Sequence, residues 1–139
     1  MIILDTNVVS EPMKANGAPS VVDWLDRQAV ETLFLTAVNL AELLVGVETM
    51  PVGKRREGVG AALTALISKL FGSRILPFDE DAARTYANLV ARARAKGVAL
   101  SVADAQIAAS ATVRGFAVAT RDTAPFVAAG VPIIDPWRP

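Results

Sequence analysis

The sequence predicts an α/β fold in which helices cover both faces of a central, mostly parallel sheet of five strands. Three observations predict it. Short apolar segments alternate with longer helix-like segments along the chain, an order typical of a parallel sheet. The short segments are apolar at consecutive positions, as expected of strands buried on both faces. The chain has 139 residues, 53% of them hydrophobic, so residues 1–139 suffice for a single domain with a buried core.

Five apolar segments are expected to form the strands. They are MIILD at 1–5, TLFLT at 32–36, RILPF at 74–78, FAVAT at 116–120 and VPIID at 131–135. Ligands of open parallel sheets sit beyond the carboxyl ends of the strands. Asp5 ends the first segment, and Asp122 follows the fourth after Thr120 and Arg121. If these two strands are neighbours, both carboxylates reach the same edge of the sheet.

The helices are expected between these strands. Ser20, Asp79 and Ser101 are the predicted N-caps of three of them, and Gly72 is expected to end another. The predicted helical segments are a single turn in 8–13 that stops near Pro12, then 21–29, 37–50, 59–71, 80–97 and 102–115, with a loop at 14–19 and a polar break at 51–58.

The composition excludes several classes of chemistry. The chain contains no cysteine and no histidine, and its 14 basic and 14 acidic side chains give a formal net charge of zero. Disulfides, thiol nucleophiles, catalytic triads and imidazole metal sites are therefore excluded. Any metal must bind among oxygens, which favours Mg²⁺, Mn²⁺ or Ca²⁺. No segment is long and apolar enough to span a membrane, and no signal peptide is evident, so a cytoplasmic protein is expected.

Glu42 lies in a helix that is apolar almost all round. Only Asn39, Glu42 and Gly46 form a narrow polar stripe on segment 37–50. A helix of this kind is expected to be buried, so Glu42 is predicted to point into a confined polar space. The alternative is a thin polar stripe that faces solvent.

Asp104 shares a helix face with apolar residues. Its neighbours on that face are Ile107, Ala108 and Ala111, and burying a carboxylate among them is costly unless its charge is compensated. The alternative is a capping box, in which Ser101 is the N-cap and Asp104 the third helical residue. Both interpretations can hold together, because a carboxylate in the first turn also gains from the helix dipole.

The four acids Asp5, Glu42, Asp104 and Asp122 each follow a strand or lie near the start of a helix. If they gather at one edge, they repel one another: a pair of charges 4 Å apart costs about 4 kcal/mol at an effective dielectric near 20. Such a cluster persists when protons or a divalent cation neutralise it. The chemistry indicated is metal-assisted attack of water on a phosphodiester.

Four segments of the sequence, which contain the four acids, resemble a known family. MIILDTNVVSEP, LTAVNLAELLVGV, SVADAQIAASA and VATRDTAPFVAAGVPIIDPW together resemble the PIN-domain ribonucleases, and in particular toxins of the VapC/FitB group of bacterial toxin–antitoxin pairs. The resemblance implies a sheet sandwiched between helices and an Mg²⁺-dependent endoribonuclease in which Mn²⁺ substitutes. It implies that the metal and catalytic residues are Asp5, Glu42, Asp104 and Asp122, with Asn7 and Thr120 as polar supports. Many related toxins carry Asn where this chain has Asp122, so the fourth carboxylate departs from a common pattern.

The resemblance also implies partners. A small DNA-binding antitoxin would wrap the toxin and insert a basic side chain among the acids. RNA is the implied substrate, and a homodimer that assembles further with the antitoxin is expected.

Several other signals leave alternatives open. Arg121 could contact a phosphate or pair with a neighbouring acid, and Trp137 is interpreted as a packing residue. The acids at 79–81 are explained by a capped helix, and the basic run at 54–57 by solvated surface. Two rival functions remain: an enzyme phosphorylated on Asp5, and a non-catalytic module whose acidic pocket captures a basic partner. The first rival lacks the usual second Asp, since position 7 is Asn.

Overall fold

The computed structural model describes residues 1–139 and contains a sheet of five strands that all run parallel to their neighbours. The strand order is β3-β2-β1-β4-β5. The predicted α/β fold is therefore confirmed, and β1 lies in the centre with β4 beside it, so that Ile3 pairs with Val118. The strands are β1 (Ile2–Leu4), β2 (Leu33–Thr36), β3 (Ile75–Leu76), β4 (Ala117–Ala119) and β5 (Ile133–Ile134).

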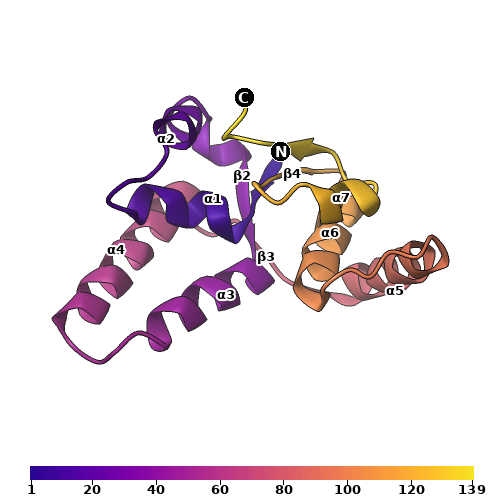
Figure 1. The fold of residues 1–139 in the computed structure, drawn as a ribbon, viewed down its shortest axis with the longest axis horizontal. Helices are drawn as coiled ribbons and strands as arrows, with labels where there is room; N and C mark the ends of the chain where they lie inside the picture. Colours follow the sequence, from indigo (N-terminus) through magenta and orange to yellow (C-terminus); the bar gives the residue numbers. More distant parts are fainter.

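The helices form two layers, one on each side of the sheet (Figure 1). The first layer contains α1 (Thr6–Ser10), the 3-10 helix η1 (Glu11–Met13), α2 (Pro19–Asp26), α3 (Ala37–Glu48) and α4 (Lys54–Phe71), and the short 3-10 helix η2 (Val30–Thr32) precedes β2. The second layer contains α5 (Glu80–Ala95), α6 (Val102–Arg114) and α7 (Ala124–Ala128). None of the helices is both long and apolar enough to cross a membrane.

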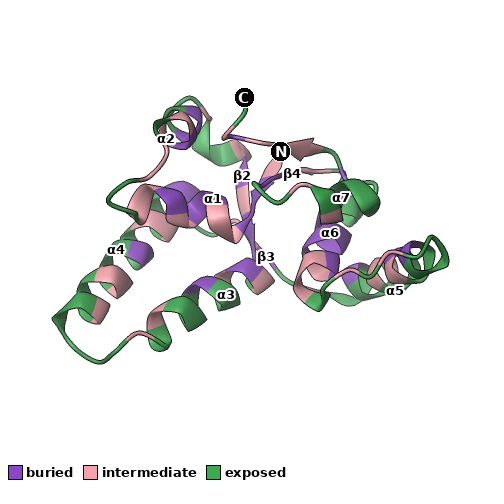
Figure 2. Ribbon diagram, in the orientation of Figure 1, coloured by how far each residue is buried: buried purple, intermediate pink, exposed green.

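Alternate residues of each strand face the two helical layers, because side chains alternate across a strand. Leu4 of β1 and Ala119 of β4 are buried in the core against the first layer. Their neighbours Ile3 and Val118 are buried in the core against the second. The strands are therefore buried on both faces, which is why they are apolar at consecutive positions (Figure 2).

The predicted N-caps Asp79 and Ser101 are confirmed, but Ser20 is wrong. Asp79 accepts a hydrogen bond from the backbone N–H of Ala82, and Ser101 accepts one from that of Asp104. Helix α2 instead begins at Pro19, with Ala18 as its N-cap. Proline fits the first helical position because its fixed φ suits the helix and its missing N–H would have had no helical partner.

The structure differs from the predicted helices in two places: the start of α4 and the presence of α7. The polar break predicted at 51–58 is too long, because α4 already begins at Lys54 after Gly53, whose φ of 153° favours glycine. The residues Lys, Arg and Glu that suggested a loop are good helix formers. Helix α7 was not predicted; it is a single short helix of five residues with a proline in its first turn.

The prediction that segment 37–50 is buried is wrong. Helix α3 packs along α4, and the pair extends away from the sheet (Figure 1). In α3 only Asn39 and Leu43 are buried, while Leu44 is 47% exposed and Val45 58% exposed. Glu42 is exposed too, but Asn39 of the same polar stripe is fully buried, so the stripe leads from the interior at the start of the helix to solvent further along it. The hydrophobic pattern gave a wrong prediction because α3 lies away from the sheet, where its neighbours cover only one of its sides and leave apolar residues on the other side exposed.

Candidate acidic site

Asp5 is buried at the carboxyl end of the central strand, with only 7% of its surface exposed. Its backbone N–H still donates to the carbonyl of Ala119 on the neighbouring strand, at 2.9 Å. As the N-cap of α1, its Oδ1 accepts from the backbone N–H of Thr6 at 2.8 Å. The other oxygen, Oδ2, accepts from the hydroxyl of Thr120 at 2.8 Å. The parallel sheet thus holds this carboxylate at the edge where ligands of such sheets bind.

The pKa of Asp5 is raised above its ordinary value of 3.8. Burial is the largest cause, because it disfavours the charged form. The hydrogen bonds from Thr120, Thr6 and Asn39 act in the opposite direction, and the negative charge of Asp104 raises the pKa further. Asp104, which is 99 positions away in the sequence (104 − 5), therefore acts on Asp5 through its charge.

Asn39 is a site residue that the sequence interpretation placed only on a polar stripe. It is fully buried, and its Nδ2 donates to Asp5 Oδ1 at 3.1 Å and to Thr6 Oγ1 at 3.2 Å. Thr36, the N-cap of α3, donates to Asn39 Oδ1 and accepts from the Asn39 backbone N–H. The signal available in the sequence was an amide one helical turn before Glu42 on the stripe.

Glu42 reaches the site from α3. Its Oε1 accepts a hydrogen bond from the Thr6 hydroxyl at 3.0 Å. Desolvation is the largest cause of its raised pKa; the bond from Thr6 lowers the pKa, and the charges of Asp5 and Asp104 raise it. Thr6 therefore connects two acids, since it contacts Asp5 through its backbone and Glu42 through its side chain.

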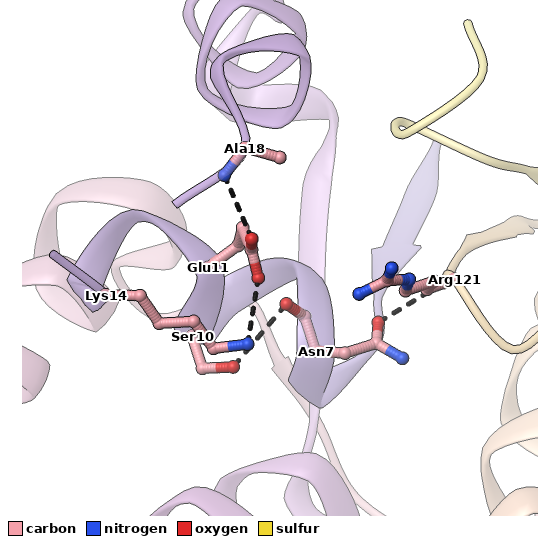
Figure 3. A network of polar contacts seen from close by, with 6 residues as sticks. All are labelled: Asn7, Ser10, Glu11, Lys14, Ala18 and Arg121. Carbon is pink, nitrogen blue, oxygen red and sulfur yellow. Dashed lines mark hydrogen bonds and ion pairs between the residues drawn. The ribbon is translucent and has the colours of Figure 1, made fainter. Parts of the chain in front are cut away.

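The segment after β4 supplies three of the predicted residues. Thr120 is fully buried, and its hydroxyl donates to Asp5 while accepting from the backbone N–H of Asp122 at 3.1 Å. The Asn7 side chain makes no hydrogen bond to the acids; its Oδ1 accepts from the backbone N–H of Arg121 at 3.4 Å and so joins α1 to this segment (Figure 3). Thr120 is thus a direct support of Asp5, whereas Asn7 supports the backbone beside it.

Asp104 and Asp122 line one open recess of about 450 Å³ beside α7. Asp104 is half-buried in the first turn of α6, and Asp122 is exposed. Neither carboxylate accepts a hydrogen bond from the protein, so their oxygens are available to a ligand. The capping box predicted from Ser101 is present only in part, because Ser101 accepts from the Asp104 backbone N–H but the Asp104 side chain does not bond back.

The charge of Asp104 raises the pKa of both Asp5 and Glu42, and Asp104 and Asp122 line the same recess. No three acidic side chains lie close enough together to enclose an ion in this structure. The available donors are nonetheless all oxygens, and several have no protein partner. Carboxylate oxygens that repel one another, some of them free of hydrogen bonds, fit a hard divalent cation such as Mg²⁺ or Mn²⁺.

Comparisons with known proteins agree with this geometry. The model of the PIN domain family matches residues 2–131. The chain is 50% identical to VapC ribonuclease Y4jK of Sinorhizobium fredii over 139 residues, which cover 100% of this chain and 99% of the relative. It is 43% identical to toxin FitB of Neisseria gonorrhoeae over 138 residues, 99% of each chain.

A solved structure shares the fold over the whole length. The crystal structure of FitAcB from Neisseria gonorrhoeae superimposes with a TM-score of 0.95 at 42% identity, covering 100% of both chains. The arrangement of strands and helices around the acids is therefore that of a structure already determined by experiment.

Proposed function

Because this chain belongs to the PIN-domain family, among the toxins of the VapC and FitB type, we propose that residues 1–139 form one PIN domain that hydrolyses RNA with Mg²⁺ or Mn²⁺. The observation that carries the proposal is the set of acids around Asp5. They come from the end of β1, from α3 and α6, and from the segment after β4, and the chain has no histidine or cysteine to act instead.

In this proposal the metal ligands are drawn from Asp5, Glu42, Asp104 and Asp122. When bound, the ion would activate water and neutralise the charge on the phosphodiester. Asp104 and Asp122 offer oxygens without protein partners, and Glu42 has one oxygen free of hydrogen bonds. Glu42, which is more exposed than Asp5, would complete the ligand set or orient the attacking water.

The neighbouring polar residues hold Asp5 in position. Thr120, the Thr6 backbone and Asn39 occupy defined lone pairs of its carboxylate. They fix the rotamer and leave Oδ2, which accepts from Thr120 alone, with a lone pair that has no protein partner. Fixed ligands of this kind orient a metal better than free ones do.

We also propose a toxin–antitoxin assembly in the cytoplasm. A DNA-binding antitoxin inserts a basic side chain among the acids, which compensates their repulsion as the metal would. The toxin itself is proposed to be a homodimer that assembles further with the antitoxin.

The test is incubation of the purified, antitoxin-free protein with total RNA. We expect endonucleolytic fragments with Mg²⁺ or Mn²⁺, none with EDTA, and none from Asp104→Asn with either metal. RNA left intact by folded wild-type protein with Mn²⁺ present would contradict the proposal and favour a binding module. Covalent phosphorylation of Asp5 would favour a phosphotransferase, although both oxygens of that carboxylate already accept hydrogen bonds.

A further inference from the structure

Arg121 is held in place although its guanidinium makes no hydrogen bond and no ion pair. Its carbon Cζ lies 5.2 Å from the centre of the Trp137 ring, within the range of a cation–π contact. Its backbone N–H is bound by Asn7. Figure 3 shows the guanidinium directed from the segment after β4 toward α1, beside Asn7.

The ring beneath Arg121 is itself fixed. Trp137 packs against the core of the first helical layer, and its backbone N–H donates to Asp135 Oδ1 at 3.0 Å in a turn that follows β5. Arg121 and Trp137 thus follow two neighbouring parallel strands, β4 and β5. Both lie at the same edge of the sheet as Asp5, because that edge carries the carboxyl ends of all the strands.

A buried carboxylate adds a long-range attraction. Glu11 is 5% exposed; its Oε1 accepts from the Ala18 backbone N–H at 3.0 Å and its Oε2 pairs with Lys14 at 3.1 Å. Its pKa is lowered first by the Ala18 N–H and also by the positive charges of Lys14 and Arg121. Arg121 is therefore attracted toward α1 without losing any of its own donors to Glu11.

Three other arginines of the chain use their guanidinium groups within the protein. Arg74 spends its donors on the carbonyls of Leu33, Val30 and Leu70, and Arg56 and Arg84 pair with acids on the surface. Arg121 combines a fixed position with five free donors, next to Asp122. Planar donors of this kind suit the oxygens of a phosphate group.

We propose that Trp137 is a positioning residue that holds Arg121 for contact with a phosphate of the RNA backbone flanking the cleaved bond. The inference rests on the proposed ribonuclease function for the identity of the ligand. An RNA is favoured over an acidic protein segment because Arg121 stands between Thr120, whose hydroxyl donates to Asp5, and Asp122, so the segment that carries it belongs to the proposed site. Trp137 acts through Arg121 and touches no reacting atom.

The test measures binding of a short, labelled, single-stranded oligoribonucleotide to the purified protein by fluorescence anisotropy in EDTA, over a range of KCl concentrations. Arg121→Gln should weaken binding about tenfold and lower the salt slope by about 0.7, the value for one phosphate contact on a single strand. Arg94→Gln is the matched control, because it removes an exposed arginine without protein contacts in the second helical layer.

Trp137 is tested with two substitutions. Trp137→Leu should weaken RNA binding about two- to fivefold, the range expected for a lost exposed cation–π contact, whereas Trp137→Phe keeps an aromatic face and should restore most of the binding. In the Arg121→Gln background, Trp137→Leu should add no further loss. In cleavage assays Arg121→Gln and Trp137→Leu should each raise KM with little change in kcat. Thermal unfolding identifies any variant that has merely lost its fold.

Three outcomes would overturn the inference. The first is a folded Trp137→Leu protein that binds RNA as the wild type does. The second is additive losses in the double variant, which would indicate direct stacking of a base on Trp137. The third is unchanged RNA binding with weakened binding of the antitoxin, which would assign Arg121 to that partner. Because binding is measured without metal, a protein that binds RNA but does not cut it would overturn only the proposed ribonuclease function.

Discussion

At the scale of single residues, Asp5 is a charge whose burial and hydrogen bonds act in opposite directions. Burial and the nearby Asp104 favour the protonated form, and three donors favour the charged one. The balance leaves the pKa of Asp5 raised, so the charged form of Asp5 lowers the stability of the metal-free protein. Sites that are built to bind a ligand commonly lower the stability of the protein in this way.

Asp5→Asn should abolish cleavage, by at least about 100-fold, without destabilising the fold at neutral pH. Asn keeps the shape and can accept from Thr6 and Asn39 as Asp5 does. The pKa of Asp5 in the folded protein lies above its ordinary value of 3.8. The protonated form therefore contributes its full stabilisation of the fold at pH values below 3.8. This contribution is lost as pH rises through the raised pKa. Urea unfolding of the metal-free proteins should therefore favour the Asn variant increasingly as pH rises; a constant difference would contradict the raised pKa.

Asn39→Ala should lower the free energy of unfolding by about 1–3 kcal/mol, because it leaves buried partners unsatisfied. Asp5 loses one donor and Thr36 loses an acceptor. The pKa of Asp5 should rise further, since a bond that lowers it is removed. Chemical denaturation measures the first effect and carboxyl NMR titration the second. Asn88→Ala, at an exposed position of α5 without side-chain contacts, is the control and should change neither.

At the scale of elements, helices α5 and α6 are both capped by a side-chain oxygen at the N-terminus, but their first turns carry different residues. Asp79 Oδ1 accepts from the Ala82 backbone N–H at 3.0 Å, and Ser101 Oγ accepts from the Asp104 backbone N–H at 3.1 Å. The two bonds close the first turns of α5 and α6. Only the turn of α6 carries a proposed metal ligand.

Asp79→Ala and Ser101→Ala should each cost about 1 kcal/mol of stability, the usual value for a lost N-cap. Only Ser101→Ala should also lower the cleavage rate, because the fraying of α6 moves Asp104. Urea unfolding and RNA cleavage at a temperature well below unfolding separate the two effects. An equal loss of activity in both variants would show that activity follows overall stability and not the position of Asp104.

Helix α3 offers a comparison of adjacent leucines. Leu43 is 7% exposed and packs in the core against the first helical layer, whereas Leu44 is 47% exposed. Leu43→Ala should therefore lower the free energy of unfolding by about 2–5 kcal/mol, and Leu44→Ala should change it by no more than about 0.5 kcal/mol. Chemical denaturation at low protein concentration gives both values. Equal losses would indicate that α3 is covered on both sides.

At the scale of the whole molecule, the site depends on how the layers meet the sheet. Asp5 directly follows the central strand, Glu42 belongs to a helix of the first layer and Asp104 to a helix of the second. A cation bound among them would join all three. Its binding energy would then stabilise the fold as a whole.

Mg²⁺ or Mn²⁺ should raise the unfolding temperature of the wild-type protein, and the gain in stability should reach about 2.7 kcal/mol when the ion is a hundredfold above its Kd. Asp104→Asn, which removes a ligand charge, should reduce this gain. The gain should also shrink as pH falls through the raised pKa values of Asp5 and Glu42, because protons compete with the metal. Differential scanning fluorimetry measures each quantity. A gain that is equal in both proteins would place the ion elsewhere.

The sequence by itself determined the elements that depend on local chemistry. Apolar runs predicted the strands, and the side chains of Asp79 and Ser101 predicted two helix starts, because a cap and its N–H lie three residues apart. The acids were proposed for a similar reason: each follows a strand or lies near the start of a helix, and the absence of histidine and cysteine left few other candidates.

Only the tertiary structure decided which of these residues meet. The bonds from Asn39 and Thr120 to Asp5 span 34 and 115 positions, and no local pattern specifies such distances. The exposure of α3 depends on where its partner helix lies, so a hydrophobic wheel could not distinguish a buried helix from an outlying one. The support of Arg121 by Trp137 likewise exists only because β4 and β5 are neighbours. Periodicity and capping act within a few residues, whereas a site is formed by packing across the whole chain.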